Sequence, residues 1–281
     1  MTGALIRLLA HGNHLWYQRL IRWVPVSNKS IRNWLESKRI FFVLACGRSG
    51  TQWLANTLNQ CEHALVEHEP MPGEAWAYIQ AIKRPEAALT YMQNFRLKEI
   101  YLRAKSPSDG QQVYGEVNGF LRRHIPALLD TIPGVVLIHL VRNGKNVVRS
   151  HVSRRALASD HPVYQQFRPP GRADYAEHWN DLSLFERNCW YWTIENRYIR
   201  KWIPLYVRFE DIISSFSAFR EQLLDPLGLH MPKPTWQQLV TRPQNVTNAF
   251  SMPPWPDWSL KEKKTFEAIC GDEMLRYGYA I

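Results

Sequence analysis

The fold is decided by the stretch Ile40-Phe41-Phe42-Val43-Leu44-Ala45-Cys46-Gly47-Arg48-Ser49-Gly50-Thr51. Its first six residues are all apolar, which is typical of a strand in the middle of a parallel sheet that helices cover on both faces. Gly47 and Gly50 predict a tight turn after this strand, and residues 53–59 predict a helix. The central unit of the chain is therefore expected to be a strand that turns directly into a helix.

Strands and helices alternate along the rest of the chain. Further strands are expected at residues 64–68, 113–117, 135–141 and 205–209. Helices are expected at residues 74–105, in the segment capped by Asn143, and at residues 174–201 and 259–275. This alternation predicts an α/β fold, with a central parallel sheet that is flanked by helices on both faces.

A chain of 281 residues is long enough for one large α/β domain, and we expect a single domain here. Its expected parts are a helical extension over residues 1–38, a cofactor-binding core over 39–215, and C-terminal helices with a loop rich in Pro and Trp over 216–281. That loop, at residues 252–258, contains three prolines and cannot be a regular helix or a central strand.

The charge of the protein favours an anionic partner. Lys and Arg number 35 against 25 Asp and Glu, which gives a formal net charge of +10. The basic residues are scattered along the chain, and no nucleic-acid-binding module is recognisable. We therefore expect a phosphorylated ligand and no nucleic-acid partner.

The cysteines and the apolar runs indicate where the protein resides. Four cysteines without a CxxC pair predict reduced, buried thiols rather than a zinc site or a disulfide framework. The longest apolar runs, residues 40–46 and 135–141, are too short to cross a bilayer. The N-terminus lacks the apolar stretch and cleavage site of a signal peptide. A cytoplasmic protein without a transmembrane segment is expected.

Residues 4–24 combine Leu, Ile and Trp with Arg and His at helical spacing. Such a basic amphipathic helix has two interpretations. It can pack its apolar face on the domain, or it can make a peripheral contact with a membrane or a partner.

The turn after the first strand has the features of an anion site. Where a strand passes through a glycine-rich turn into a helix, backbone N–H groups and the positive end of the helix dipole converge on an anion. Ser49 and Thr51 add hydroxyl groups, and Arg48 adds a guanidinium. No Lys-Ser or Lys-Thr pair follows Gly50, so this is not a Walker A loop. The turn predicts a site for a phosphate or phosphosulfate group and disfavours an ATP-dependent kinase.

A second junction of the same kind follows the most apolar strand. It reads Arg142-Asn143-Gly144-Lys145-Asn146-Val147-Val148-Arg149-Ser150. Ligands of open parallel sheets bind outside the carboxyl ends of the strands, so Arg142 is expected to face the same crevice as Arg48. Two anion sites on one crevice predict a ligand with two separate phosphate groups.

Together, the two segments resemble the signatures of the sulfotransferase superfamily. These are the phosphosulfate loop, here Gly47-Arg48-Ser49-Gly50-Thr51-Gln52-Trp53-Leu54, and the 3′-phosphate segment from Arg142 to Ser150. The resemblance covers about residues 39–215, and its loop style is that of bacterial and tyrosylprotein sulfotransferases. It implies a fold like that of P-loop nucleoside-triphosphate hydrolases, and metal-independent transfer of a sulfuryl group from 3′-phosphoadenosine 5′-phosphosulfate to a hydroxyl or amine.

The same resemblance implies roles for individual residues. Residues 47–53 would bind the donor, Arg142 and Ser150 would hold its 3′-phosphate, and Trp53 would stack on the adenine. Many cytosolic members have Lys in place of Arg48, whereas an arginine stays protonated and can grip two oxygens at once. The Arg-Lys-Gly element of cytosolic members is missing, and the candidates to replace it are Arg242, Asn245 and the loop at 255–258.

Sulfuryl transfer to a hydroxyl needs a group that takes the proton of the acceptor. The candidates lie in the segment Glu67-His68-Glu69. If the segment is extended, Glu67 and Glu69 share one face and His68 points to the other. The spacing from Arg48 resembles that of the catalytic glutamate in tyrosylprotein sulfotransferases, which favours Glu69. His68 is the alternative, because imidazole accepts a proton near neutral pH with little tuning.

Glu116 and Asn118 stand near the position of the histidine base in cytosolic members. Asn118 cannot accept a proton, so these residues are expected to position the acceptor or cofactor, or to be solvated at a strand end. His139 is expected to be a core histidine, and the histidine spacing predicts no metal site.

The sequence leaves the acceptor open among small molecules, carbohydrates, lipids and peptides. Two alternative functions also remain at this point: a phosphotransferase that uses ATP, and a non-catalytic module that binds 3′-phosphoadenosine 5′-phosphate.

Overall fold

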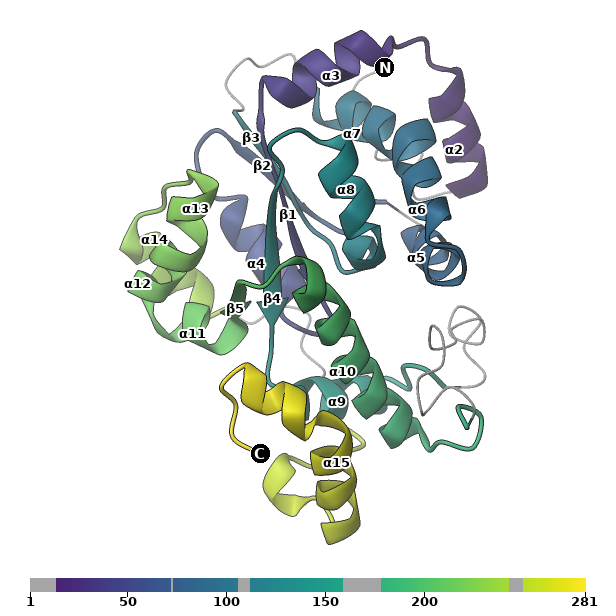
Figure 1. The fold of residues 1–281 in the computed structure, drawn as a ribbon. Coiled ribbons are helices and arrows are strands. Elements are labelled where there is room, and N and C mark those ends of the chain that lie inside the picture. The colour runs from purple at the N-terminus through teal and green to yellow at the C-terminus, as the bar shows by residue number, and fades with distance from the viewer. Residues whose placement is uncertain (1–13, 72, 106–111, 159–177, 243–249) are drawn as a thin grey trace.

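The computed structural model describes residues 14–71, 73–105, 112–158, 178–242 and 250–281. Within these ranges, five parallel strands form one sheet in the order β2-β3-β1-β4-β5 (Figure 1). The strands are β1 (Arg39–Ala45), β2 (Ala64–His68), β3 (Val113–Val117), β4 (Val136–Val141) and β5 (Tyr206–Arg208). The predicted α/β fold with a central parallel sheet is confirmed.

Helices flank this sheet on both faces (Figure 1). The helices before and between the first four strands are α2 (His14–Trp23), α3 (Asn28–Glu36), α4 (Thr51–Leu58), α5 (Glu74–Lys83), α6 (Glu86–Tyr91), α7 (Leu97–Ala104) and α8 (Ile125–Thr131). Those that follow are α9 (Gly144–Ser153), α10 (Leu184–Trp202), α11 (Phe209–Ser214), α12 (Phe216–Phe219), α13 (Asp225–Leu227), α14 (Lys233–Val240) and α15 (Leu260–Arg276). Short π-helical or 3₁₀ turns are η1 (Met92–Arg96), η2 (Phe120–His124), η4 (Arg220–Leu224) and η5 (Trp255–Asp257).

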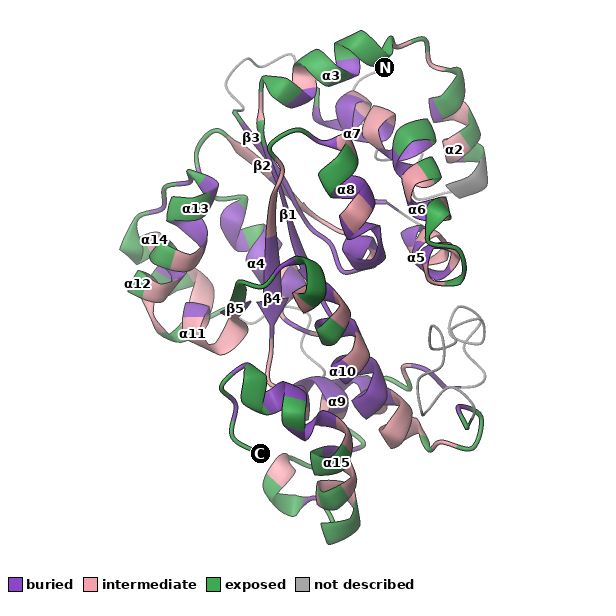
Figure 2. Ribbon diagram, in the orientation of Figure 1, coloured by how far each residue is buried: buried purple, intermediate pink, exposed green. Residues whose placement is uncertain are grey.

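The alternation of side chains along β1 builds two cores. Phe41, Val43 and Ala45 face α4 and the helices α11 to α14, where they join one buried cluster. Phe42 and Leu44 face α3, α7 and α8 and join another. Because both faces of the central strands are covered, nearly every residue of β1 is buried (Figure 2). The apolar run in the sequence thus reflects burial on both sides of the sheet.

Local capping explains where several helices begin. Asn143 caps α9 as predicted, because its side chain accepts a hydrogen bond from the N–H of Lys145. The two longest helices among the described residues, α10 and α15, each begin with a capping box, in which a serine and a glutamate three residues later bond to each other's backbone N–H.

Some predicted boundaries were wrong. The helix expected at 174–201 begins at Leu184, after turns at residues 178–182, and residues 174–177 lie outside the described residues. The stretch 74–105 is interrupted before Pro85, because the residue that precedes a proline is pushed out of the helical region. Phe209, expected to end the last strand, instead begins α11. Of the expected helix at 4–24, the structure describes only the part from residue 14.

A buried network of ion pairs lies beside β3. In it, Arg96 contacts Glu74, Glu99 and Glu116, and Arg103 contacts Glu99 and Glu116. The Arg96 Nε to Glu74 Oε1 distance is 2.7 Å, and the Arg103 Nη2 to Glu116 Oε1 distance is 2.9 Å. Burial raises the pKa of Glu99 to about 8, although Arg96 opposes this shift. The network joins α5, η1, α7 and β3 into one unit.

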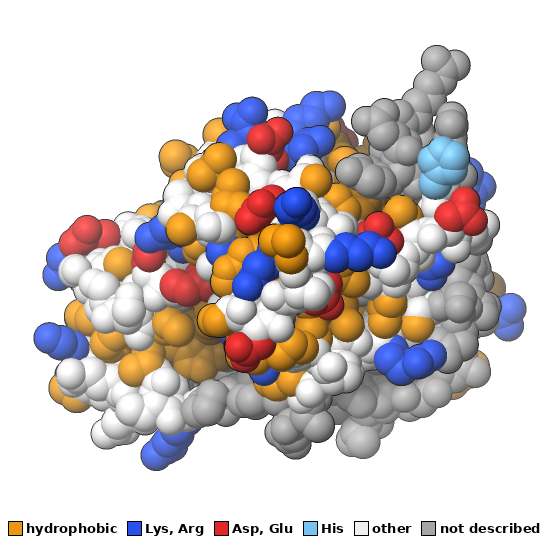
Figure 3. Space-filling view, turned by 90° about the horizontal axis from the view of Figure 1, so that it is seen from below, with side chains coloured by type: hydrophobic (Ala, Val, Ile, Leu, Met, Phe, Trp, Pro, Cys, Tyr) orange, Lys and Arg blue, Asp and Glu red, His pale blue; other side chains and the backbone are white. Residues whose placement is uncertain are grey.

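Among the described residues, no helix combines the length and the apolar composition that crossing a membrane requires. On the face seen in Figure 3, Lys and Arg side chains are interspersed with Asp and Glu. This distribution agrees with the scattering of basic residues along the sequence.

Candidate functional site

The turn between β1 and α4 has an unusual backbone. Arg48 has a φ of 66°, and Gly50 has a φ of 88°. A Cβ atom at Gly50 would lie 2.1 Å from the ring of Phe209, so only glycine fits there. The left-handed conformation at Arg48 is strained for a residue with a side chain, and such strain is concentrated at functional sites. No side chain caps α4, which leaves its first N–H groups for an anion.

The second junction meets this turn directly. Arg142 follows β4 and donates from Nη1 to the carbonyl of Arg48 at 3.1 Å. Arg48 in turn donates from Nε to the hydroxyl of Ser150 at 3.0 Å. β1 and β4 are neighbours in the sheet, but the chain leaves β1 towards β2 and leaves β4 towards β5 on the other side. Ligands bind at such a switch point in open α/β sheets.

The charges at this junction are mostly positive, and the acidic group beside them is Glu210, whose Oε1 accepts the N–H of Asn143 at 3.1 Å. Burial lowers the pKa of Arg48 to about 10, and repulsion from Arg154 and Arg142 adds to the shift. Burial also lowers the pKa of Arg142, and Glu210 partly opposes it. Both guanidinium groups nevertheless stay protonated at neutral pH. The junction therefore presents closely spaced cations that an anion would stabilise.

Two buried polar atoms at the junction support this interpretation. The hydroxyl of Ser49 and the Nε of Arg142 have no hydrogen-bond partner among the described residues. Buried polar groups in native proteins are nearly always hydrogen-bonded, so unpaired ones indicate a missing partner. A phosphate or sulfate oxygen is an acceptor of the kind that both groups need. The residues present therefore fit an anionic ligand.

Glu69 lies at the end of β2, where the backbone turns with a φ of 40°. Its Oε1 accepts a hydrogen bond from the N–H of Gly119 at 3.3 Å. A Cβ atom at Gly119 would lie 3.0 Å from that Oε1 and 3.3 Å from the carbonyl of Ala45, so Glu69 adjoins the end of β1. Burial raises the pKa of Glu69 to about 7, against the effect of the Gly119 N–H. The carboxyl group therefore exchanges a proton near neutral pH.

His68 and its neighbour Glu67 point to opposite faces of the sheet, as the alternation of side chains along a strand requires. The Nε2 of His68 lies 2.9 Å from the hydroxyl of Thr51, in the first turn of α4. Glu67 instead forms an ion pair with Arg103 on the side of the buried network. Burial lowers the pKa of His68 to about 4, so its imidazole is neutral at pH 7 and a weak proton acceptor.

Glu116 and Asn118 are buried, and their expected solvation at a strand end was wrong. The amide of Asn118 donates to Glu74 at 2.7 Å and to Glu116 at 2.9 Å. Its Oδ1 accepts the N–H of Phe120 at 3.0 Å. These contacts place both side chains in the ion network under the site. Whether they position the acceptor or cofactor stays a prediction.

Both strand-to-helix junctions lie within a segment that matches a known protein family. The model of the sulfotransferase family matches residues 41–233, which include both strand-to-helix junctions. The chain belongs to the sulfotransferase family.

Two solved sulfotransferases are similar to this family member. A sulfotransferase from Alicyclobacillus acidocaldarius is similar over 87% of this chain and 97% of its own, with 13% identity and a TM-score of 0.50. The sulfotransferase STF1 from Mycobacterium tuberculosis H37Rv is matched over 90% of this chain and 82% of its own, with 14% identity and a TM-score of 0.49. No curated protein sequence matches the chain. At 13% identity, the similarity to the Alicyclobacillus acidocaldarius structure is evidence for the fold alone.

In this sulfotransferase, Trp53 belongs to the first turn of α4 and packs into the core. Its ring meets Phe209 and Phe219 at centroid distances of 5.7 and 6.4 Å, and its Nε1 donates to the carbonyl of Leu239 at 3.0 Å. Only 4% of the side chain is exposed, so packing occupies most of the indole. Its stacking on an adenine stays a prediction.

Two residues that sequence reasoning did not assign also belong to the site, His151 in α9 and Arg154 at the C-cap of that helix. Burial is the main cause of the lowered pKa of Arg48, and repulsion from Arg154, which lies four positions after Ser150, adds to it. His151 Nε2 donates to the carbonyl of Gly47 at 3.0 Å, which holds the turn against α9. The spacing of Ser150 and Arg154 is the sequence signal that could have found the third arginine.

The C-terminal candidates for a contact with the 3′-phosphate have different surroundings. Asn245 is outside the described residues, and Arg242 is exposed. Trp255 packs on Trp258 and Phe266 with ring centroids 4.8 and 5.4 Å apart, so the loop at 255–258 covers α15. Their role in the 3′-phosphate site stays a prediction. The described part of the chain contains no cluster of three His, Cys, Asp or Glu side chains that could hold a metal.

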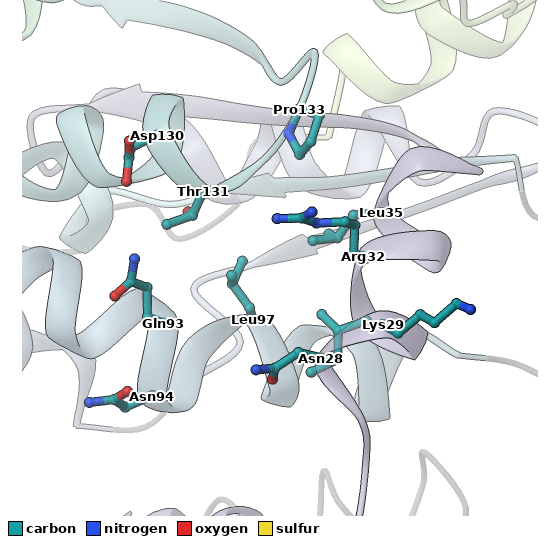
Figure 4. A pocket seen from close by; sticks show the side chains of 11 residues that line it. Asn28, Lys29, Arg32, Leu35, Gln93, Asn94, Leu97, Asp130, Thr131 and Pro133 are labelled. Atoms are coloured by element: carbon teal, nitrogen blue, oxygen red, sulfur yellow. The ribbon is translucent and has the colours of Figure 1, made fainter.

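A cavity of about 720 Å³ lies elsewhere in this sulfotransferase, between α3, η1 and the end of α8 (Figure 4). Arg32 reaches into it from α3, opposite Gln93 and Asp130. Because α3 leads into β1 and Pro133 precedes β4, this cavity adjoins the amino ends of the strands. The ligands of such sheets bind at the carboxyl ends, so it is separate from the anion site.

Proposed function

We propose that this sulfotransferase transfers a sulfuryl group from 3′-phosphoadenosine 5′-phosphosulfate to a hydroxyl or amine of its acceptor. The observation that carries the proposal is the convergence of Arg48, Arg142 and Ser150 on one edge of the sheet. Two helix starts at neighbouring strand ends suit a nucleotide that carries one anionic group at its 5′ end and another at its 3′ position.

The binding roles follow from the two junctions. The turn from Gly47 to Thr51 would hold the phosphosulfate through backbone N–H groups and the hydroxyls of Ser49 and Thr51, with Gln52 and Trp53 continuing the site along α4. Arg142 and Ser150 would bind the 3′-phosphate. Arg154 adds a third cation close to Arg48. When bound, the donor supplies the sulfuryl group that is transferred.

Arg48 would stabilise the reaction electrostatically. As the bond to the departing phosphate breaks, negative charge grows on the bridging oxygen, and a fixed guanidinium stabilises that charge. Arg48 does not serve as a proton donor, because its pKa of about 10 keeps it charged at neutral pH. Its contact with Ser150 holds the guanidinium at the junction with Arg142.

Glu69 is the proposed general base. It would take the proton of the acceptor hydroxyl as the oxygen attacks sulfur, and a carboxylate with a pKa near 7 is matched to that task at physiological pH. His68 is a weaker candidate because its lowered pKa makes it a poor proton acceptor. We assign to His68 the orientation of the Thr51 hydroxyl.

Thermal-shift titration tests the donor and separates the alternatives. The proposal expects 3′-phosphoadenosine 5′-phosphate to stabilise the protein without metal, by about 2.7 kcal/mol at a concentration one hundred times the dissociation constant. A phosphotransferase would instead respond to ATP with Mg²⁺. Transfer of labelled sulfate from the donor to small-molecule, carbohydrate, lipid and peptide acceptors then distinguishes an enzyme from a silent binding module. We also propose that the whole chain forms one domain and acts in the cytoplasm.

A further inference from the structure

Helix α2 is attached to the protein by its inner face. Tyr17 and Ile21 are fully buried there. The hydroxyl of Tyr17 donates to Glu99 at 3.3 Å, and its ring packs edge-to-face on Phe95 with the centroids 6.3 Å apart. From α7, Lys98 donates to the carbonyl of Arg22 at 3.0 Å. The inner side of this basic helix therefore packs on the domain, which is one of the two interpretations of the sequence.

The outer face of α2 is unlike an ordinary solvated surface. Trp16 is 51% exposed and Trp23 is 86% exposed. They are seven residues apart, with Arg19 and Leu20 between them, so the four side chains follow one stripe of the helix. We call this stripe the tryptophan face. Tryptophan side chains are seldom exposed to this extent in a folded protein. Two of them on one helix indicate a surface that a partner covers when the protein functions.

The charged side chains of α2 and of the first turns of α3 are of one sign, although the exposed Glu86 lines a pocket together with Arg22. The first acidic residue of the sequence is Glu36, whereas five basic residues precede it: Arg7, Arg19, Arg22, Lys29 and Arg32. Of these, Arg19 and Arg22 are exposed on α2, and Lys29 and Arg32 are exposed on α3, which follows after a short loop (Figure 1). The described part of this region thus complements an anionic surface.

We propose that the tryptophan face docks the protein on an anionic lipid bilayer. Tryptophan prefers the interface of a bilayer, where its ring is shielded from water and its N–H keeps a polar partner. Arginines next to it can bind lipid phosphates, and each basic side chain near such a surface adds to the attraction. A protein partner is the other candidate, because Trp and Arg are both enriched in protein interfaces. The charged side chains of α2 are all basic, which favours the bilayer, whose lipid phosphates form a continuous anionic surface. The buried Tyr17 and Ile21 keep the helix folded against the domain while its outer face binds.

Co-sedimentation with vesicles tests the proposal with the full chain. The probes are vesicles of phosphatidylcholine alone and of phosphatidylcholine with phosphatidylglycerol. We expect binding to the anionic vesicles only, and a loss of roughly tenfold or more in partitioning for the variant Arg19→Gln/Arg22→Gln. The variant Trp16→Ser/Trp23→Ser should lose binding as well, and the tryptophan fluorescence of the wild type should shift to the blue on binding.

Matched controls lie on other helices. Trp202→Ser removes another exposed tryptophan, at the end of α10, and Lys261→Gln/Lys264→Gln removes two exposed charges from α15, far from α2 in Figure 1. Both controls should bind anionic vesicles as the wild type does. Circular dichroism shows whether each variant is folded, and the donor plays no part, so the result is independent of the proposed activity.

Three results would overturn the proposal. The first is that the wild type does not bind anionic vesicles. The second is that the tryptophan or arginine variants bind as well as the controls do. The third is a dimer that forms without lipid and is lost in the tryptophan variant, which would identify the face as an interface between two copies of this chain.

Discussion

The Nε of Arg48 lies 3.0 Å from the hydroxyl of Ser150, although 102 positions separate the two residues in the chain. Arg142, which follows β4, donates a hydrogen bond to the carbonyl of Arg48 and so joins the two junctions. The burial and the mutual repulsion of these cations, seen in the lowered pKa values of Arg48 and Arg142, cost stability as long as no anion is bound. The site is therefore preorganised for an anionic ligand, and several predictions about single residues depend on it.

Replacing Arg48 by Ala should reduce kcat/KM for sulfuryl transfer by about 10²–10³-fold, because a fixed donor to the developing charge is lost. Arg48→Lys should retain part of the activity, since it keeps a cation although it loses the planar fork. Steady-state transfer of labelled sulfate measures both variants. Arg220→Ala, which removes an exposed arginine, is the control and should be unaffected. Full activity of Arg48→Ala would contradict the assigned role.

The activity of the wild type should rise with pH through about 7, because Glu69 must be ionised to accept a proton and burial raises its pKa to about that value. Glu69→Gln should abolish turnover while the affinity for 3′-phosphoadenosine 5′-phosphate stays within about twofold. A pH profile of kcat/KM and a binding titration measure these effects. An active Glu69→Gln variant that keeps the rise near pH 7 would show that another group is the base.

The same carboxyl group links folding to pH. The native state holds the proton of Glu69 more tightly than the unfolded chain does, so the free energy of unfolding should fall as pH rises from about 4.5 to about 7. Glu69→Gln removes this loss of stability, and the variant should be more stable than the wild type by up to about 3 kcal/mol at pH 8. Urea unfolding at pH 5 and pH 8 measures the difference. Equal stability of the two proteins at pH 8 would argue against the raised pKa.

His68→Gln should keep the rise of activity near pH 7, because burial lowers the pKa of His68 to about 4 and the imidazole does not titrate in that range. Losing the 2.9 Å contact with Thr51 should instead weaken donor binding several-fold. The two effects are separated by measuring KM for the donor and kcat across pH. If the rise near pH 7 disappears in this variant, His68 rather than Glu69 is the base.

Arg96→Leu should destabilise the protein by about 3–5 kcal/mol, since it leaves buried carboxyl groups without their cation. Arg220→Leu, whose ion pair with Glu221 is exposed, should change the free energy of unfolding by less than about 1 kcal/mol. Urea unfolding at pH 7 compares the two variants. Similar losses in both would mean that the buried network does not hold α5, η1 and β3 together.

Much of the fold could be predicted because the signal is local. The run at 40–45 is apolar on both faces, and the strands at 64–68 and 113–117 were confirmed residue for residue. Asn143 was recognised as a cap because an asparagine accepts the N–H two residues later. The boundary at Phe209 could not be read, because its ring packs in the core and would suit a buried strand or a helix start equally well.

The surroundings of the site depend on contacts between distant residues. Asn118 bonds to Glu74, 44 positions away, and the sequence gives no sign of this pairing. Glu69 has a positive φ, so the condition of an extended backbone, on which the shared face of Glu67 and Glu69 depends, does not hold at residue 69. By contrast, the two arginines of the anion site were identified from the strand ends that carry them, since parallel strands bring their carboxyl ends to one edge.

The most direct test of the account compares two nucleotides in two proteins. The affinities of 3′-phosphoadenosine 5′-phosphate and of adenosine 5′-phosphate, which lacks the 3′-phosphate, are measured by calorimetry without metal for the wild type and for Arg142→Ala. The account predicts that the wild type prefers the bisphosphate by about tenfold or more, and that this preference is largely lost in Arg142→Ala while the affinity for adenosine 5′-phosphate hardly changes. An undiminished preference in Arg142→Ala would contradict the claim that the two strand ends bind one nucleotide together.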